Sequence, residues 1–276
     1  MVTSPHDTQF DRDLALTDTE RPYVYTGSFG QRWYIDRALH GGHVISAIVR
    51  AFERAVADPA RALRSITVHY VRPAQVGPYT IEVVIDRTGR SLSNARAQII
   101  QGGSVIASAM AALGGQWASI EWDRTAMPDV RPPEECPVLW TDGATSALHH
   151  NYTYRRAIGG PVRSGGMHPE SGGWVNLADP RPVDAALAAG LADTWPPTPF
   201  MMISVPIKFP TIDLTVQLLA PLPLEGDDGR EPCLVWHKID SSVGGYVIQD
   251  TEVWTRGGRL IARGRQHALL IPVAPG

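Results

Sequence analysis

The chain has 276 residues, 43% hydrophobic and 19% charged, so it is long enough for one large or two ordinary domains with a sizeable core. Its 28 acidic residues outnumber the 25 basic ones, which excludes the basic surface of proteins that bind nucleic acids or anionic membranes. No apolar stretch reaches the ~18 residues that span a bilayer, and the N-terminus lacks the pattern of a signal peptide. We therefore expect a cytoplasmic protein that makes no contact with membranes.

Residues 1–20 are acidic and polar, and they predict a mobile leader. Residues 21–115 then alternate between strand-like and helix-like patterns. The predicted helix has an apolar stripe at helical spacing, with Val44, Ile48 and Phe52 at its centre. In chain order the pattern predicts strands over 23–28 and 31–35, a helix over 42–56, and strands over 65–72, 79–87, 91–101 and 104–113.

Residues 116–149 contain several prolines and show no regular periodicity, so we predict a connector there. Residues 150–276 repeat the order of elements that precedes the connector. Their helix is apolar on nearly all sides, which predicts that a curved sheet wraps around it. The elements of this second segment are predicted as strands over 151–155 and 173–177, a helix over 183–193, and strands over 203–209, 211–219, 233–240, 244–255 and 259–271.

Two pairs of similar segments indicate an internal duplication. Alternating strands begin at Ser65 and at Thr211, an offset of 146 residues, and both run into a proline. The segments that begin at Gly103 and Gly258 are likewise similar, at an offset of 155 residues. A long helix against a curved antiparallel sheet is the hotdog architecture, and its presence twice predicts an α+β double hotdog. The predicted copies are an N-terminal hotdog, 21–115, and a C-terminal hotdog, 150–276.

The sequence also resembles the acyl-CoA thioesterase II-like (TesB-like) double-hotdog thioesterases, over roughly residues 20–115 and 150–272. The resemblance rests on four motifs: His40-Gly41-Gly42-His43-Val44, Leu191-Ala192-Asp193, Thr211-Ile212-Asp213 and Arg265-Gln266-His267. That family hydrolyses acyl-CoA thioesters with a water molecule that an Asp, a Thr and a Gln activate. The resemblance therefore implies catalytic roles for Asp193, Thr211 and Gln266.

The residues themselves support part of this assignment. Asp193 ends an apolar helix, where a buried carboxylate needs hydrogen-bond donors and also meets the negative end of the helix dipole. A functional role explains this position, although a solvent-facing residue is the alternative. Asp184 lies at the start of the same helix, and we interpret it as a structural cap.

Gln266 and Thr211 give weaker signals on their own. Gln266 is the one polar side chain on the predicted inward face of the last strand, so it is either a satisfied core amide or a site residue. Threonine is ordinary at the start of a strand. Period two places Thr211 with Asp213 and Thr215, so a bulge or the strand end has to turn it inward.

The start of the first helix is a candidate binding surface for the substrate. Free N–H groups at a helix N-terminus suit a developing oxyanion, and glycines there would let a thioester approach the backbone. We therefore predict substrate binding by His40, Gly41 and Gly42, with close packing as the alternative explanation for the two glycines. In the first repeat Ser65, Ala111 and a residue near Ala47 stand at the predicted equivalents of the catalytic set, which predicts one functional centre per chain.

Other chemistries lack their sequence patterns. We find no nucleophile elbow, phosphate-binding loop or zinc-ligand spacing, so we expect no metal and no cofactor. The expected function is hydrolysis of a fatty or related acyl-CoA. A non-catalytic acyl-CoA or acyl-carrier binding protein is an alternative, and a hydratase or dehydratase is a weaker one, because no Asp is followed five positions later by a His. An acyl-carrier protein as partner and a homodimer or higher homo-oligomer are left open, as is the acyl chain length.

Overall fold

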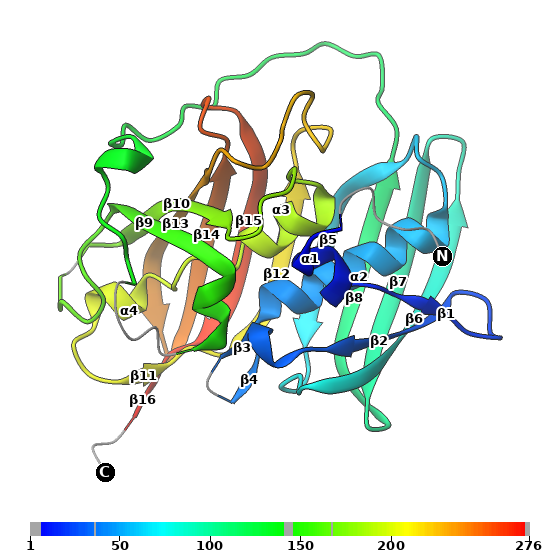
Figure 1. Cartoon of the computed structure of the whole chain (residues 1–276), viewed down its shortest axis with the longest axis horizontal. Coiled ribbons are helices and arrows are strands. Elements are labelled where there is room, and N and C mark those ends of the chain that lie inside the picture. Colours follow the sequence, from blue (N-terminus) through cyan, green and yellow to red (C-terminus); the bar gives the residue numbers. More distant parts are fainter. Residues whose placement is uncertain (1–6, 36, 141–145, 167, 274–276) are drawn as a thin grey trace.

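The computed structural model describes residues 7–35, 37–140, 146–166 and 168–273 of the chain. Its centre is one twelve-stranded sheet in the order β1-β2-β6-β7-β8-β5-β12-β15-β14-β13-β10-β9, with antiparallel neighbours throughout (Figure 1). The first half supplies β1 (Thr17–Asp18), β2 (Val24–Phe29), β5 (Ala62–Tyr70), β6 (Gly77–Thr88), β7 (Leu92–Gln101) and β8 (Ser104–Gly114). The second half supplies β9 (Tyr152–Ile158), β10 (Glu170–Leu177), β12 (Thr211–Leu218), β13 (Cys233–Val243), β14 (Tyr246–Trp254) and β15 (Leu260–Leu269).

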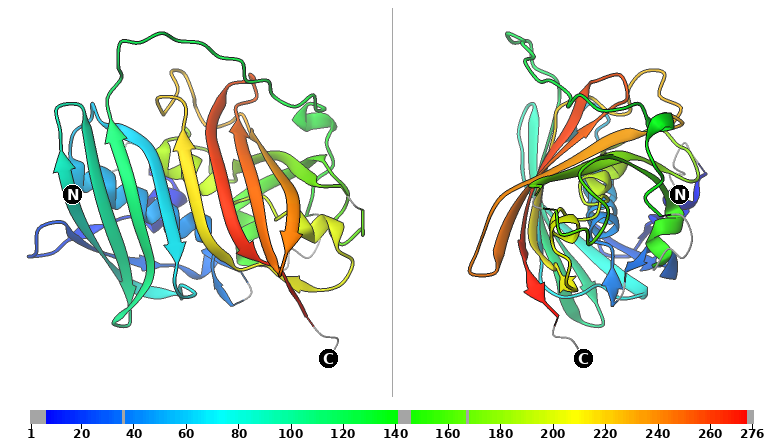
Figure 2. Two further views of the ribbon diagram at one scale, coloured as in Figure 1. Left: turned by 180° about the vertical axis from the view of Figure 1, so that it is seen from behind. Right: turned by 90° about the vertical axis from the view of Figure 1, so that its left-hand side faces the viewer.

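Two helices lie against the same face of this sheet, one from each half (Figure 2). They are α2 (Gly41–Val56) and α3 (Ala185–Leu191). Every residue of α3 is buried, as its apolar sequence predicts. The structure therefore confirms the predicted double hotdog. Helix α3 is shorter than the predicted helix at both ends, because it starts after its cap, Asp184, and ends at Leu191, before Ala192 and Asp193.

The two helices cross through small residues. The Ser46 hydroxyl donates to the carbonyl of Gly42 at 2.8 Å and lies 2.7 Å from the carbonyl of Ala186. A Cβ atom on Gly190 would lie 2.7 Å from the Ser46 Oγ, so a side chain there would displace the Ser46 hydroxyl from its contacts at this crossing. This close approach brings the end of α3 next to the start of α2.

The strand order is symmetric about the junction of β5 and β12, so each strand of one half has an equivalent in the other. A bulge between Leu63 and Ser65 of β5 matches one between Thr211 and Asp213 of β12. The offset for this pair of strands is therefore 211 − 63 = 148 residues, and the predicted offset of 146 is wrong. The prediction aligned the strand starts, but β5 begins at Ala62, before Ser65. The offset of 155 between β8 and β15 agrees with the pairing of both strands.

The expectation of a mobile leader is wrong for the part of residues 1–20 that the structure describes, which starts at residue 7. Helix α1 (Gln9–Asp13) buries Phe10 and Leu14, each 2% exposed, in the core. Phe10 packs edge-on against Trp33 with ring centroids 5.8 Å apart, and the guanidinium of Arg181 lies over the Phe10 ring. Burial of these apolar rings anchors the segment. Residues 1–6 of the predicted leader lie outside the described residues.

The strand predicted over 203–209 is mostly absent. Helix α4 (Pro199–Met202) precedes it, and only β11 (Ile207–Lys208) is extended, paired with β16 (Ile271–Pro272). Pro206 and Pro210 bracket β11 and lack the N–H groups that would continue a ladder. A second small sheet joins β3 (Tyr34–Ile35) to β4 (Ala38–Leu39), after a short 3-10 helix over Gln31–Trp33.

The segment between the halves runs along one edge of the molecule, from the end of β8 to the far side of the second half (Figure 1). Residues 115–132 form neither helix nor strand, and short 3-10 helices follow at Pro133–Glu135 and Ala147–Asn151. Residues 141–145 of the predicted connector lie outside the described residues. None of the helices in the described part of the chain is long and apolar enough to cross a membrane.

Candidate active site

Asp193 lies directly after α3, at the point where the two helices meet. Its side chain is 13% exposed. The Nε2 of Gln266 donates to the Asp193 Oδ1 at 2.9 Å, and the backbone N–H of Gly42 also donates to this carboxylate. Asp193 follows the negative end of α3, where the helix dipole disfavours a carboxylate. It faces the positive end of α2, which offsets this unfavourable interaction.

The environment of Asp193 favours its neutral form overall. Burial raises the pKa of the carboxyl group, and it outweighs the opposing effects of His40, of the Gly42 N–H and of the Gln266 amide. The result is a pKa above the ordinary aspartate value. A carboxylate with a raised pKa accepts a proton more readily than an exposed aspartate, which suits a general base.

Thr211 reaches the site through a bulge in the ladder. The pairing of β12 with β15 shifts between Thr211 and Asp213, so Thr211 leaves the outer face to which strict alternation would assign it. Its hydroxyl oxygen accepts a hydrogen bond from the Nε2 of Gln266 at 2.6 Å. The bulge expected from the sequence is thus present, and it brings Thr211 into contact with Gln266.

Gln266 joins the other two residues. It lies on the inward face of β15 and is 3% exposed, as the alternation of the last strand predicts. Its Nε2 donates one hydrogen bond to Asp193 and the other to Thr211. The structure therefore brings together all three residues that the sequence indicated, from the end of α3, the start of β12 and the middle of β15.

His40, Gly41 and Gly42 lie on the other side of Asp193. The His40 Nε2 is 2.8 Å from the backbone oxygen of Asp193 and 3.5 Å from its Oδ2, and the ring is only 4% exposed. A Cβ on Gly41 would lie 2.8 Å from the Asp193 Oδ2, whereas one on Gly42 would lie 2.6 Å from the backbone oxygen of Gly190. Gly41 therefore makes room for the carboxylate, and Gly42 makes room for the crossing helix.

Two further polar residues contact this group, and the sequence analysis missed both. The Tyr70 hydroxyl donates to the Gly41 carbonyl at 3.0 Å. The Nε2 of Gln249 donates to the Oε1 of Gln266 at 3.1 Å. Gln249 lies on the inward face of β14 with Val247, Thr251 and Val253, so alternation places it inward, but it is not the one polar side chain on its face as Gln266 is.

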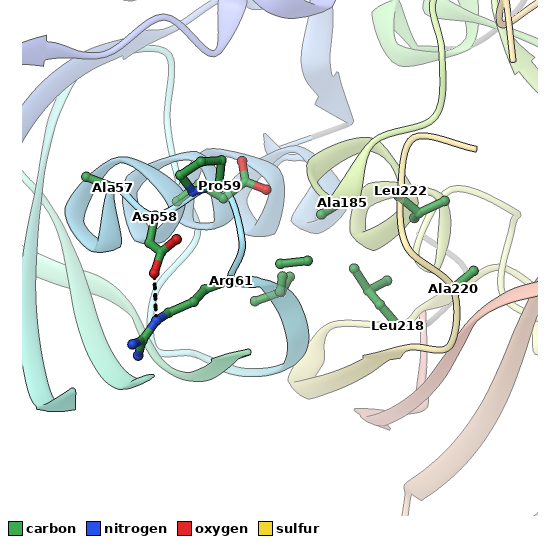
Figure 3. Close-up of a pocket in the computed structure, with 11 residues that line it drawn as sticks. Ala57, Asp58, Pro59, Arg61, Ala185, Leu218, Ala220 and Leu222 are labelled. Carbon is green, nitrogen blue, oxygen red and sulfur yellow. Dashed lines mark hydrogen bonds and ion pairs between the residues drawn. The ribbon is translucent and has the colours of Figure 1, made fainter. Parts of the chain in front are cut away.

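The equivalent position in the first half is a cavity of about 300 Å³, where aliphatic side chains lie beside the charged residues Glu53, Asp58 and Arg61 (Figure 3). Leu63, the equivalent of Thr211, lines it, and Leu218 occupies the place equivalent to Tyr70 by the same offset of 148 residues. Ala111 is the equivalent of Gln266. The sequence analysis assigned Ser65 to Thr211, which the corrected register replaces with Leu63. The residues equivalent to Thr211 and Gln266 are therefore apolar in the first half.

Within the described residues, no group of three or more His, Cys, Asp or Glu side chains could hold a metal ion. His43, the second histidine of the first motif, is stacked on Trp33 with ring centroids 4.2 Å apart and is 1% exposed. Burial lowers the pKa of its ring well below the ordinary value, so His43 belongs to the aromatic core.

Comparisons with known proteins agree with this geometry. The acyl-CoA thioesterase N-terminal domain family matches residues 29–114, and the acyl-CoA thioesterase C-terminal domain family matches residues 133–270. The chain belongs to the acyl-CoA thioesterase family. This membership makes it a thioester hydrolase of the TesB-like, double-hotdog kind.

Solved structures with the same fold cover nearly the whole thioesterase. A hotdog protein of unknown function from Alicyclobacillus acidocaldarius is 27% identical, with a TM-score of 0.86 over 98% of this chain and 99% of that one. A candidate thioesterase II from Thermobifida fusca YX is 20% identical, with a TM-score of 0.81 over 97% and 99% of the two chains. An acyl-CoA thioesterase II from Mycobacterium marinum is 22% identical, with a TM-score of 0.76 over 96% and 99%. Among curated proteins, none matches the chain significantly.

Proposed function

We propose that this thioesterase hydrolyses a fatty or related acyl-CoA to the free acid and CoA, and that Asp193, Thr211 and Gln266 activate the water. The observation that carries the proposal is the Gln266 amide nitrogen, which donates to both Asp193 and Thr211 within one buried site. Hydrolysis of a thioester needs a proton acceptor for the water and groups that orient it, and these three side chains supply both.

In the proposed reaction, the Asp193 carboxylate takes a proton from a water molecule as the water oxygen attacks the thioester carbonyl carbon. The C–S bond then breaks, and the leaving thiolate takes the proton from Asp193, which gives CoA and restores the carboxylate. The Thr211 oxygen accepts a hydrogen bond from Gln266, so the Thr211 proton is available to bind the water or the carbonyl oxygen.

We propose that His40, Gly41 and Gly42 shape the site around the reacting group. The Gly42 N–H is already used by Asp193, and the His40 ring contacts the backbone of Asp193. These contacts support a role in fixing the carboxylate. Gly41, whose missing side chain leaves space beside the Asp193 Oδ2, is the residue of this group that we expect to lie nearest the thioester.

A hydrolysis panel tests the function. The wild-type protein is expected to release free thiol from CoA thioesters of short, medium and long acyl chains, with one range preferred, and a thiol reagent measures the release. Parallel assays with enoyl-CoA would detect a hydratase, and calorimetry with a non-hydrolysable acyl-CoA ether would detect a binding protein. Binding of the ether without hydrolysis of any thioester, on CoA or on an acyl-carrier protein, would overturn the proposal.

The dependence of hydrolysis on pH gives a second test. Asp193 must be ionised to accept a proton, and burial raises its pKa, so activity is expected to fall on the acid side at a pH above the ordinary titration range of an aspartate. The measurement is kcat/KM against pH, with circular dichroism at each point to confirm that the protein stays folded. Constant kcat/KM down to about pH 4 in the folded protein would contradict the assignment of Asp193 as the base.

We also propose a cytoplasmic location. Cys136 and Cys233 are buried and unpaired, which suits a reducing compartment. Burial raises the pKa of the Cys233 thiol to about 12, so this side chain behaves as an apolar group and not as a nucleophile.

A further inference from the structure

A continuous chain of hydrogen bonds leads away from the candidate site into the core. Beyond Gln266 it passes to Gln249, which lies directly opposite Gln266 in the pairing of β14 with β15. The Gln249 Oε1 accepts a hydrogen bond from the backbone N–H of Thr198 at 2.9 Å. The Thr198 hydroxyl in turn lies 3.0 Å from the Ser171 hydroxyl. Both glutamines are buried, at 1% and 3% exposure.

The backbone N–H of Thr198 fixes the orientation of the Gln249 and Gln266 side-chain amides. The Thr198 N–H can only donate, so the side-chain atom of Gln249 that faces it must be the oxygen. The Gln249 NH₂ group then faces Gln266 and donates to the Gln266 Oε1. As a result the Gln266 NH₂ group faces Asp193 and Thr211 and cannot exchange places with the oxygen without loss of a hydrogen bond.

The duplication provides an independent observation. In the first half, Ala95 of β7 lies opposite Ala111 of β8, as Gln249 lies opposite Gln266 in the second half. Both alanines are buried, at 1% and 7% exposure. The two amides are thus present together in the half with the candidate site and absent together in the other half, which associates Gln249 with the site and not with the fold.

We infer that Gln249 is a positioning residue for hydrolysis, and that it acts by holding the Gln266 amide with its NH₂ group toward Asp193 and Thr211. The inference rests on the proposed function of that site. Without Gln249 the Gln266 amide is free to turn, and in the turned state its oxygen would face the Asp193 carboxylate, so that neither could donate to the other.

The first test is the substitution Gln249→Ala, which recreates the arrangement at Ala95. We expect kcat to fall roughly tenfold to a hundredfold with KM changed less than about threefold, because the lost interaction orients a reacting group. Thr251→Val is the matched control. Thr251 lies two residues further along β14 on the same buried face, 2% exposed, and its change should leave kcat near that of the wild type. A kcat for Gln249→Ala equal to that of the control would overturn the inference.

Two further measurements separate positioning from a structural effect. In a Gln266→Ala background, Gln249→Ala is expected to cause little further loss, whereas independent structural damage would multiply the two losses. In Gln249→Glu, the ionised side chain cannot donate to Gln266, but its protonated form can. The activity of this variant relative to wild type is therefore expected to fall as pH rises, and a ratio independent of pH in folded protein would count against the inference.

The outcomes also distinguish this inference from the proposed function. If the wild type hydrolyses no thioester, the proposed function fails first and the substitutions have no activity to test. If the wild type is active and Gln249→Ala retains full kcat, the function stands and the role of Gln249 is rejected. Thermal melts of each variant identify unfolding. If Gln249→Ala does not fold, Gln249→Glu near its acid limit provides the same comparison within one protein.

Discussion

Replacement of Asp193 by asparagine is expected to lower kcat for thioester hydrolysis by roughly 10²–10⁴-fold, the usual contribution of a general base. Asparagine keeps the shape of the side chain and has one acceptor oxygen, which the Gln266 amide and the Gly42 N–H would share, so the site should still form. What the variant loses is the ability to take a proton from water. Substrate binding should persist, and calorimetry with a non-hydrolysable acyl-CoA ether measures it.

The same substitution is expected to preserve or increase stability near neutral pH. Because burial raises the pKa of Asp193 in the folded state, the folded protein holds this proton more tightly than the unfolded chain does. The resulting stabilisation is present at acid pH and is lost as pH rises through the folded-state pKa. Asparagine carries no such charge, so its Tm at neutral pH should equal or exceed that of wild type.

Asp250→Asn is the matched control for this experiment. Asp250 lies on the outer face of β14 and forms an exposed ion pair with Arg265, so its loss should change kcat and Tm only slightly. A variant of Asp193 that hydrolyses thioesters at the wild-type rate would remove the residue from the mechanism. A variant with a strongly lowered Tm would show that the carboxylate holds the structure together.

Replacement of Gly42 by alanine is expected to destabilise the protein by about 1–3 kcal/mol, the usual cost of overpacking. Alanine in a helix is normally more stable than glycine by roughly 0.5–1 kcal/mol. Here the added Cβ would lie 2.6 Å from the backbone oxygen of Gly190 and 2.4 Å from the His40 ring, so steric repulsion decides the sign. The two helices would have to separate at their crossing.

Activity should fall together with stability in this variant, because the Gly42 N–H donates to the Asp193 carboxylate and would move with the helix. Gly30→Ala is the matched control, since nothing lies within 4 Å of its Cβ position and its φ of −90° is ordinary for alanine. Thermal and urea unfolding of the two variants measure the difference. Equal stability of Gly42→Ala and Gly30→Ala would contradict the close crossing of α2 and α3.

Local patterns were sufficient to predict most of the fold. The apolar stripe of Val44, Ile48 and Phe52 predicts a helix because side chains recur on one face every 3.6 residues, and α2 forms there. Alternation in the last strand predicts that Gln266 points inward, and it does. The predictions that failed are those that depend on distant packing, such as the leader anchored by Phe10 and the strand start misplaced at Ser65.

For the candidate site too, the sequence predicted the individual residues, whereas their contacts depend on distant packing. The family resemblance indicated Asp193, Thr211 and Gln266 as candidate catalytic residues. For Asp193 and Gln266 the sequence pattern supports this, because each is a polar residue in an otherwise apolar helix or strand face. Only the tertiary structure decided that the three meet, since their contact needs a bulge in β12 and the crossing of two helices from different halves. The internal duplication was also predictable from the sequence, because the chain is long enough for two ordinary domains and contains two pairs of similar segments. Which of its polar residues act together, Gln249 included, depends on the strand register, which is set by pairing between segments far apart in the chain.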